Sequence, residues 1–163
     1  MTNAPPIHGF AHLTFPIFDL DVAERFYVGV LGAQLVRRFD HPTFLRFRPD
    51  RAAEVDADNS PLHLAVAFPG APEVHLFLQK DRKKTAPVPH PHLAMSVEPG
   101  DLDGFVERLK TAGALVDGPR RLGPPGHASV YFADPFGNTL ELVTMGYEGK
   151  VTEGPPDVTR LGW

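Results

Sequence analysis

Apolar residues along the chain follow two kinds of spacing, one typical of strands and one typical of amphipathic helices. Apolar side chains recur every three or four residues over 23–31, and Gly32 then ends the predicted helix. A second helical stripe runs over 102–109, and Asp21 with Glu24 has the spacing of a capping box for the first helix. The strands predicted from alternation and flanking turn residues are 12–17, 34–38, 62–68, 74–79, 114–117, 129–133 and 139–144, with 43–47 as a further short one.

These elements occur twice in the same order, and the two copies also match in sequence. The first copy begins His12–Leu13–Thr14 and the second begins His92–Leu93–Ala94. An Asp-Leu-Asp segment follows in each copy, at 19–21 and at 101–103, before the predicted helix. An internal repeat of this kind indicates duplicated structural units. The sequence therefore predicts an α+β fold made of two βαβββ modules.

The segments between these elements set the expected organisation, a single domain over residues 1–163. Module one covers about 8–80 and module two about 92–145, with the proline-rich segment 86–91 as a linker. Residues 48–60 are polar and acidic, and we expect them to form an exposed insertion. The glycine- and proline-containing tail at 146–163 is expected to be irregular and to pack back on the domain or on a partner chain.

Composition excludes several classes of function. The chain has no cysteine, so a metal site can use only histidine and carboxylate ligands. The net charge is −4 and basic runs are nearly absent, which argues against nucleic-acid binding. No apolar run approaches the ~20 residues that span a bilayer, and the first residues lack the pattern of a signal peptide. We expect a cytoplasmic protein that does not bind membranes.

Three residues stand out as candidate metal ligands. His12 and His92 occupy equivalent places at the start of equivalent strands, and Glu141 lies in an apolar strand. A carboxylate buried between apolar neighbours is costly unless it is paired, protonated or bound to a cation. Two imidazoles and one carboxylate leave coordination positions open and suit Fe(II), Mn(II) or a similar ion. Such an ion can bind two adjacent oxygens of a small substrate and act as a Lewis acid.

These residues lie in motifs that resemble the vicinal oxygen chelate superfamily, which includes glyoxalase I, extradiol dioxygenases, fosfomycin-inactivating thiol transferases and bleomycin-binding proteins. The matching segments are Ala11–Thr14, Arg25–Gly32, His92–Ala94 and, most specifically, Tyr131–Glu141. The resemblance covers about His8 to Met145. It implies two modules whose sheets form a cup around a metal held by His12, His92 and Glu141. It also implies a small-molecule substrate with vicinal oxygens and a homodimer.

A fourth ligand would separate glyoxalase I from the other members. The resemblance places that ligand in the last strand of the first module, where repeat alignment gives Phe77. Phenylalanine cannot ligate a metal, so a site with three ligands is favoured. A glyoxalase-like lyase or isomerase is therefore a less favoured alternative function. A shift of two residues would bring His75 or Gln79 to that position.

The function we predict first is that of an extradiol-type dioxygenase acting on a catechol-like substrate. Tyr131 precedes Glu141 by ten residues, as in that family, and would donate a hydrogen bond to the substrate. His75 would act as an acid/base, and His127 stands in the loop before the tyrosine. In this interpretation Fe(II) binds the diol and O2 takes an open position.

Two alternatives remain. A fosfomycin-type thiol transferase shares the same ligands together with Thr14 and Tyr131, but its potassium-binding loop is replaced here by Gly123–Ala128. It would also need inward-facing cations for a phosphonate, and the candidates are Arg120, Arg121 and Lys150. The other alternative is a drug-sequestering binding protein, which would keep its ligand affinity after the metal is removed.

Overall fold

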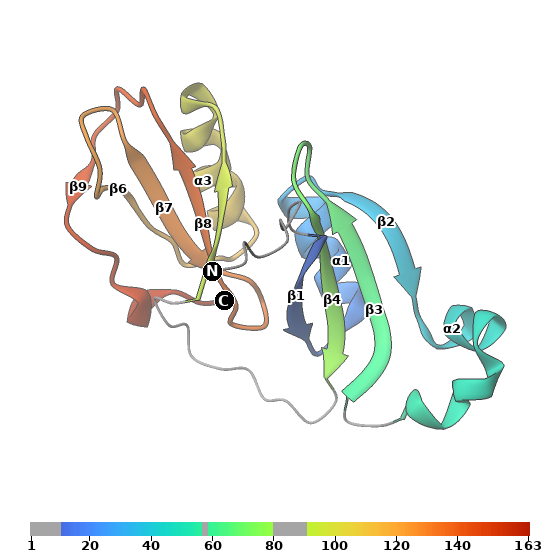
Figure 1. Cartoon of the computed structure of the whole chain (residues 1–163). Coiled ribbons are helices and arrows are strands. Elements are labelled where there is room, and N and C mark those ends of the chain that lie inside the picture. The colour runs from blue at the N-terminus through green and yellow to red at the C-terminus, as the bar shows by residue number, and fades with distance from the viewer. Residues whose placement is uncertain (1–10, 57–58, 80–90) are drawn as a thin grey trace, which may run out of the picture. The chain divides into compact units, whose positions relative to one another are not determined.

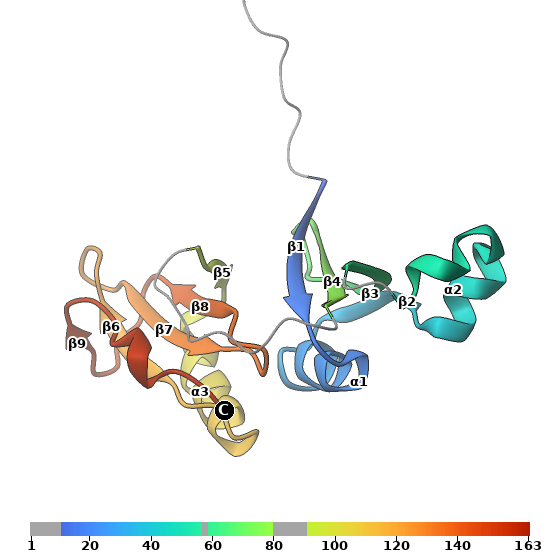
Figure 2. The same ribbon diagram turned by 90° about the horizontal axis from the view of Figure 1, so that it is seen from below.

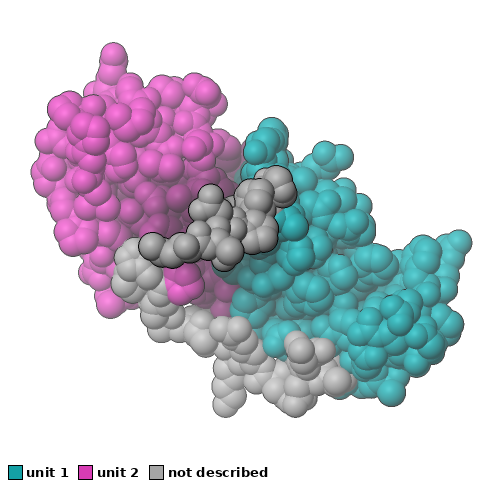
Figure 3. All heavy atoms as spheres, in the orientation of Figure 1, with its two compact units in different colours: residues 1–81 teal, residues 82–163 magenta. Residues whose placement is uncertain are grey.

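The computed structural model describes residues 11–56, 59–79 and 91–163 (Figure 1). The chain divides into two compact units, residues 1–81 and 82–163, coloured separately in Figure 3. The predicted α+β class and the two βαβββ modules are confirmed, since each unit contains one mixed sheet with a helix after its first strand. Most of the predicted linker at 86–91 lies outside the described residues.

Unit 1 contains a four-stranded sheet in the order β1-β4-β3-β2. The strands are β1 (His12–Ile17), β2 (Gln34–Phe39), β3 (Asn59–Ala67) and β4 (Glu73–Gln79). β1 pairs with β4 in parallel, and the other neighbours are antiparallel. Figure 2 shows the helical segment labelled α1 on one face of this sheet. Ile17, Leu64 and Leu76 are fully buried in this unit, together with Tyr27 of the helical segment.

The first helix starts two residues earlier than the capping-box spacing suggested. Asp19 is the N-cap of α1 (Leu20–Glu24), because its carboxylate accepts a hydrogen bond from the Val22 amide at 2.9 Å. Glu24 does not close a capping box but pairs with Arg38 of β2 at 2.5 Å. The helix continues as a π-helix, η1 (Arg25–Val30), and the chain turns at Gly32.

The short strand predicted at 43–47 is wrong, because these residues belong to a helix, α2 (His41–Phe47). Asp40 caps this helix by accepting from the Thr43 amide at 3.1 Å, and a proline occupies its first turn. The following insertion forms a 3-10 helix, η2 (Pro49–Glu54). It is not wholly exposed, since Val55 is buried in a small core with Phe44 and Leu62.

Unit 2 contains a five-stranded sheet in the order β5-β8-β7-β6-β9. The strands are β5 (Leu93–Ser96), β6 (Asp117–Arg121), β7 (Ala128–Ala133), β8 (Thr139–Thr144) and β9 (Thr152–Glu153). The helical elements are η3 (Pro99–Asp101), α3 (Leu102–Thr111) and η4 (Val158–Arg160). All six residues of β7 are buried, and α3 lies against one face of the sheet (Figure 1).

The strand predicted at 114–117 lies further along the chain, because β6 begins only at Asp117. Leu115 instead forms an isolated bridge with Gly162 of the tail. The tail packs on its own unit: β9 pairs with β6, and the Trp163 indole donates to the Ala133 carbonyl at 2.6 Å. Across the described ranges, no helix is long and apolar enough to cross a membrane.

Candidate metal centre

Glu141 lies at the centre of a buried hydrogen-bonded group in unit 2. Its side chain comes from β8 and is only 7% exposed. One carboxylate oxygen, Oε2, lies 3.0 Å from Nε2 of His92, while Oε1 accepts a 2.6 Å hydrogen bond from the Ser129 hydroxyl. The carboxylate is therefore satisfied on both oxygens, which compensates for the cost of burying its charge.

Strand pairing explains why these side chains meet. β5 runs parallel to β8 with Ala94 opposite Glu141, so His92, just before β5, lies near the same end of the sheet. On the other side of β8, antiparallel β7 places Tyr131 directly opposite Glu141. Ser129 is two residues from Tyr131 and therefore projects from the same face of β7.

Tyr131 is held as a hydrogen-bond donor. Its ring meets His92 edge to face, with the ring centroids 5.9 Å apart. Burial, with further contributions from the charge of Glu141 and a hydrogen bond to it, raises the pKa of Tyr131 to about 12. The phenol thus stays protonated at neutral pH and can donate to an oxygen of a bound molecule.

His92 and Glu141 fit a divalent ion. An imidazole nitrogen and a carboxylate oxygen already converge to 3.0 Å at a buried position, and both donor types suit Fe(II) and Mn(II). The second carboxylate oxygen accepts a hydrogen bond from Ser129. Metal-ligating carboxylates are commonly oriented by such an outer hydrogen-bond partner. Neither unit, within its described residues, gathers three His, Cys, Asp or Glu side chains in a metal-binding group.

His12, the third predicted ligand, lies in unit 1 as the first residue of β1. Its ring is stacked on that of His75, with the centroids 4.4 Å apart and the planes 5° from parallel. The Nε2 atom of His75 lies 2.9 Å from the Glu73 carboxylate, which also pairs with Arg37. His75 is thus anchored to its own strand, and its ring supports the ring of His12.

The row of rings continues across the sheet of unit 1. His63 of β3 stacks on His75, with a centroid distance of 5.6 Å, and on Phe77 at 4.6 Å. Burial lowers the pKa of His63 below its ordinary value, more than the hydrogen bond to the Pro61 carbonyl raises it.

Strand register corrects the assignment of the fourth-ligand position. Glu141 pairs with Ala94, and the repeat equivalent of Ala94 is Thr14. Thr14 pairs with His75, whereas Phe77 pairs with Pro16, two residues further along β1. The equivalent of Glu141 is therefore His75 and not Phe77. Phe77 therefore gives no reason to exclude a fourth ligand. What favours three ligands is that the Glu73 carboxylate already holds the His75 ring.

The other predicted site residues are found in unit 2. His127 precedes β7, with its Nε2 3.4 Å from the Ser129 hydroxyl. Arg120 forms a two-pronged ion pair with Asp117, at 2.6 and 3.0 Å, and the side chain of Arg121 pairs with Glu153. These two arginines are already paired with carboxylates, whereas Lys150 is exposed and forms no ion pair with the residues that the structure describes.

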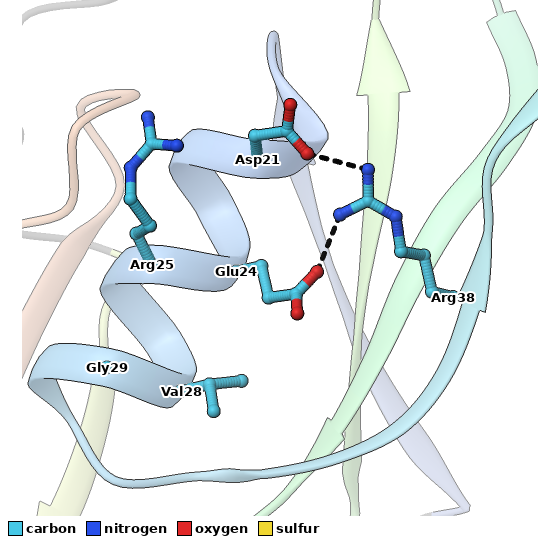
Figure 4. A pocket seen from close by; sticks show the side chains of 6 residues that line it. All are labelled: Asp21, Glu24, Arg25, Val28, Gly29 and Arg38. Carbon is cyan, nitrogen blue, oxygen red and sulfur yellow. Dashed lines mark hydrogen bonds and ion pairs between the residues drawn. The ribbon is translucent and has the colours of Figure 1, made fainter.

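A hollow of about 440 Å³ in unit 1 lies beside the first helix and β2 (Figure 4). Figure 4 shows the Arg38 guanidinium between the carboxylates of Asp21 and Glu24, at 2.7 and 2.5 Å. These ion pairs hold the helix to β2. None of the predicted metal ligands lines this hollow.

Ser129 is the site residue that the sequence did not reveal. A serine inside an apolar strand carries no signal of its own, and its spacing from Tyr131 gains meaning only once β7 and β8 are known to pair. Its fully buried side chain and short bond to Glu141 mark it as part of the site.

Known proteins resemble this chain in both sequence and fold. Residues 9–142 match the family model of the Glyoxalase/Bleomycin resistance protein/Dioxygenase superfamily. Metallothiol transferase FosB of Shouchella clausii (strain KSM-K16) is 30% identical over 140 residues, covering 85% of this chain and 81% of the relative.

Among solved structures, fosfomycin resistance protein FosX from Mesorhizobium loti aligns with a TM-score of 0.60 and 25% identity, covering 89% of this chain and 94% of its own. A mutant of FosX from Listeria monocytogenes, complexed with Mn(II) and 1S,2S-dihydroxypropylphosphonic acid, aligns with a TM-score of 0.61 and 19% identity, covering 84% and 92%. The chain belongs to the Glyoxalase/Bleomycin resistance protein/Dioxygenase superfamily, which is the vicinal oxygen chelate superfamily.

Proposed function

We propose that this protein is a divalent-metal-dependent transferase of the fosfomycin-resistance type, which adds a thiol to a small electrophilic substrate with adjacent oxygens. The named relatives FosB and FosX favour this alternative over the extradiol dioxygenase that the sequence reading put first. The observation that carries the proposal is the group formed by Glu141, His92 and Tyr131, on a chain 30% identical to a metallothiol transferase.

In this proposal His12, His92 and Glu141 hold one divalent ion. The described residues contain no group of three such side chains, so His12 enters this proposal from the family resemblance and from its place equivalent to His92 in the repeat. Mn(II) is the first ion to test, since it is the one bound in the complex of the Listeria FosX mutant. When bound, the ion would supply Lewis-acid polarisation of the substrate oxygens.

The proposed reaction opens an epoxide with a thiol. The sulfur attacks one ring carbon, a C–S bond forms and the C–O bond to that carbon breaks. The released oxygen receives the proton that the thiol gave up, so the product is a hydroxy thioether. Tyr131 is the residue suited to donate a hydrogen bond to the oxygen on which negative charge develops, because its raised pKa of about 12 keeps the phenol protonated.

The charged group of a substrate needs a partner of opposite charge in the site. A phosphonate needs a cationic partner, and Arg120 and Arg121 are occupied by Asp117 and Glu153. Lys150 is the predicted cation left for that role. A neutral epoxide is therefore a necessary comparison substrate in any assay.

The test is a substrate assay with the Mn(II)-loaded protein. Fosfomycin and a neutral epoxide are incubated with cysteine or with water alone, and products are followed by 31P NMR and mass spectrometry. We expect a thioether adduct that disappears in the Glu141→Gln variant and after chelation. Ring cleavage of catechols by the anaerobically Fe(II)-loaded protein on admission of O2, without any epoxide product, would restore the dioxygenase reading.

Two other outcomes of the same assay are informative. Binding of an epoxide or aromatic drug that survives chelation, without turnover, would point to a sequestering protein. A diol product formed with water in place of a thiol would keep the metal site but change the acceptor. We also infer a homodimer from the family resemblance, which light scattering of the purified chain tests directly.

A further inference from the structure

A chain of hydrogen bonds runs from the loop before β7 to the rear of Glu141. The Leu122 amide lies 3.5 Å from Nδ1 of His127, and Nε2 of the same ring lies 3.4 Å from the Ser129 hydroxyl. The hydroxyl is then 2.6 Å from Oε1 of Glu141. The first two contacts are long for hydrogen bonds and the last is short. The chain ends on the carboxylate oxygen that does not face His92.

The direction of these bonds follows from the donor at the start. A backbone amide can only donate, so Nδ1 of His127 accepts and a neutral ring carries its proton on Nε2. That N–H faces the oxygen of Ser129, whose single proton is then left for Glu141. Each group thus fixes the orientation of the next, and the carboxylate is held with Oε2 toward His92.

The loop leaves room for His127 at one specific position. A β-carbon at Gly123 would lie 3.0 Å from Cδ2 of the imidazole and 2.9 Å from its Cγ, and the second distance is shorter than real β-carbon contacts. The His127 amide donates to the Pro124 carbonyl at 3.0 Å, and Gly126 turns the chain with a φ of +86°. Gly123 itself needs no positive φ, so the imidazole is what a side chain there would displace.

We infer that Ser129 and His127 are positioning residues for Glu141, and that the loop at 123–127 exists here to seat His127. This role differs from the catalytic one considered for His127 from sequence, because the ring reaches the site only through Ser129. The inference rests on the proposed function, in which Glu141 is a metal ligand. It extends that proposal to residues that touch neither metal nor substrate.

Loss of an outer partner of a metal ligand typically lowers metal affinity by about 10- to 100-fold. Ser129→Ala removes the direct donor and should weaken Mn(II) binding by about that factor. Ser129→Thr keeps a hydroxyl at the same place and should restore most of the affinity. Gly123→Ala leaves Ser129 and Glu141 intact but displaces the imidazole, so it should weaken binding less than Ser129→Ala.

The experiment measures Mn(II) affinity of the full-length protein by electron paramagnetic resonance, in competition with a chelator, for the wild type and these variants. Matched controls are Ser96→Ala, an exposed serine of β5, and Gly100→Ala, where a β-carbon meets nothing within 4 Å. Thermal unfolding of each variant separates a positioning role from a general loss of structure. If Ser129→Ala does not fold, the surface-loop variant Gly123→Ala still decides.

Lower affinity in Ser129→Ala and Gly123→Ala, with wild-type affinity in the controls and recovery in Ser129→Thr, supports the inference. Wild-type affinity in both Ser129→Ala and Gly123→Ala overturns it while leaving the metal site intact. Absence of Mn(II) binding in the wild type itself would overturn the proposed function together with this inference. The two failures are therefore distinguishable in one series of measurements.

Discussion

The two units have the same strand order around their first strands but place different chemistry at equivalent positions. In unit 2, Glu141 lies opposite Ala94 and is held by His92 and Ser129. In unit 1, the equivalent of Glu141 is His75, which pairs with Thr14 and stands in a row of stacked rings. One unit thus carries a buried charge with fixed partners, and the other carries neighbouring imidazoles.

A carboxylate and an imidazole need different surroundings when they are packed in a sheet. A buried carboxylate must have hydrogen-bond or ionic partners on its oxygens, which requires polar side chains at defined strand positions. An imidazole ring can instead be packed by its faces, as the rings of His12 and His75 are. The duplicated fold therefore carries a hydrogen-bonded carboxylate in unit 2 and a row of stacked histidines in unit 1.

The largest expected effect tests how strongly unit 2 depends on its buried strands. Phe132 in β7 is fully buried, and Phe132→Ala should lower the free energy of unfolding by about 3–5 kcal/mol. Phe47 of unit 1 is 62% exposed, so Phe47→Ala should change it by no more than about 0.5 kcal/mol. Urea unfolding measures both, and equal losses would contradict this contrast between the two regions.

The next effect concerns the donor beside Glu141. Tyr131→Phe keeps the ring that meets His92 but removes the hydroxyl, and should lower the turnover number by about 10²-fold when the site is saturated with Mn(II). The matched control is Tyr147→Phe, because Tyr147 also has its pKa raised to about 12, by its hydrogen bond to Asp103. Unchanged turnover in Tyr131→Phe would remove this residue from the mechanism.

The smallest effect is a pH dependence of stability in unit 1. Burial lowers the pKa of His63 below 6.5, so the folded protein binds a proton there less readily than the unfolded chain. Its contribution to stability is fully present above the ordinary histidine pKa and is lost as the pH falls below it. The slope it adds is at most about 1.4 kcal/mol per pH unit.

His63→Phe should remove that part of the slope, because phenylalanine can keep the stacking with Phe77 without titrating. His41→Asn, an exposed change at the start of α2, serves as the control. Chemical unfolding at pH 5 to 7 compares the three proteins. A slope that is unaltered in His63→Phe would show that the buried imidazole does not set it.

The repeat in the sequence was enough to predict the two modules and the equivalent places of His12 and His92. The strand at 139–144 was predicted with its observed bounds, since its apolar residues stand between clear turn signals. The prediction of a strand at 43–47 was wrong because the aromatic residues of this segment are typical of strands. The cap at Asp40 and the proline after it favour a helix instead.

Register is what the sequence could not supply. The repeat alignment assigned the position equivalent to Glu141 to Phe77, which is two residues beyond the correct residue, His75. A shift of two residues keeps a side chain on the same face of the sheet, so the hydrophobic pattern does not reveal it. The same limit hid Ser129, whose role depends on pairing between β7 and β8. The ion pair between Arg121 and Glu153 likewise joins residues that lie far apart in the sequence.

We propose that His12, His92 and Glu141 hold one divalent ion, and the most direct test is Mn(II) stoichiometry and affinity for the wild type and single alanine variants. We expect one ion per chain, lost in His92→Ala and Glu141→Ala and strongly weakened in His12→Ala. His75→Ala should keep most of the affinity, because Glu73 already engages that ring. Wild-type binding in the three ligand variants, or a loss in His75→Ala as great as that in Glu141→Ala, would contradict the account.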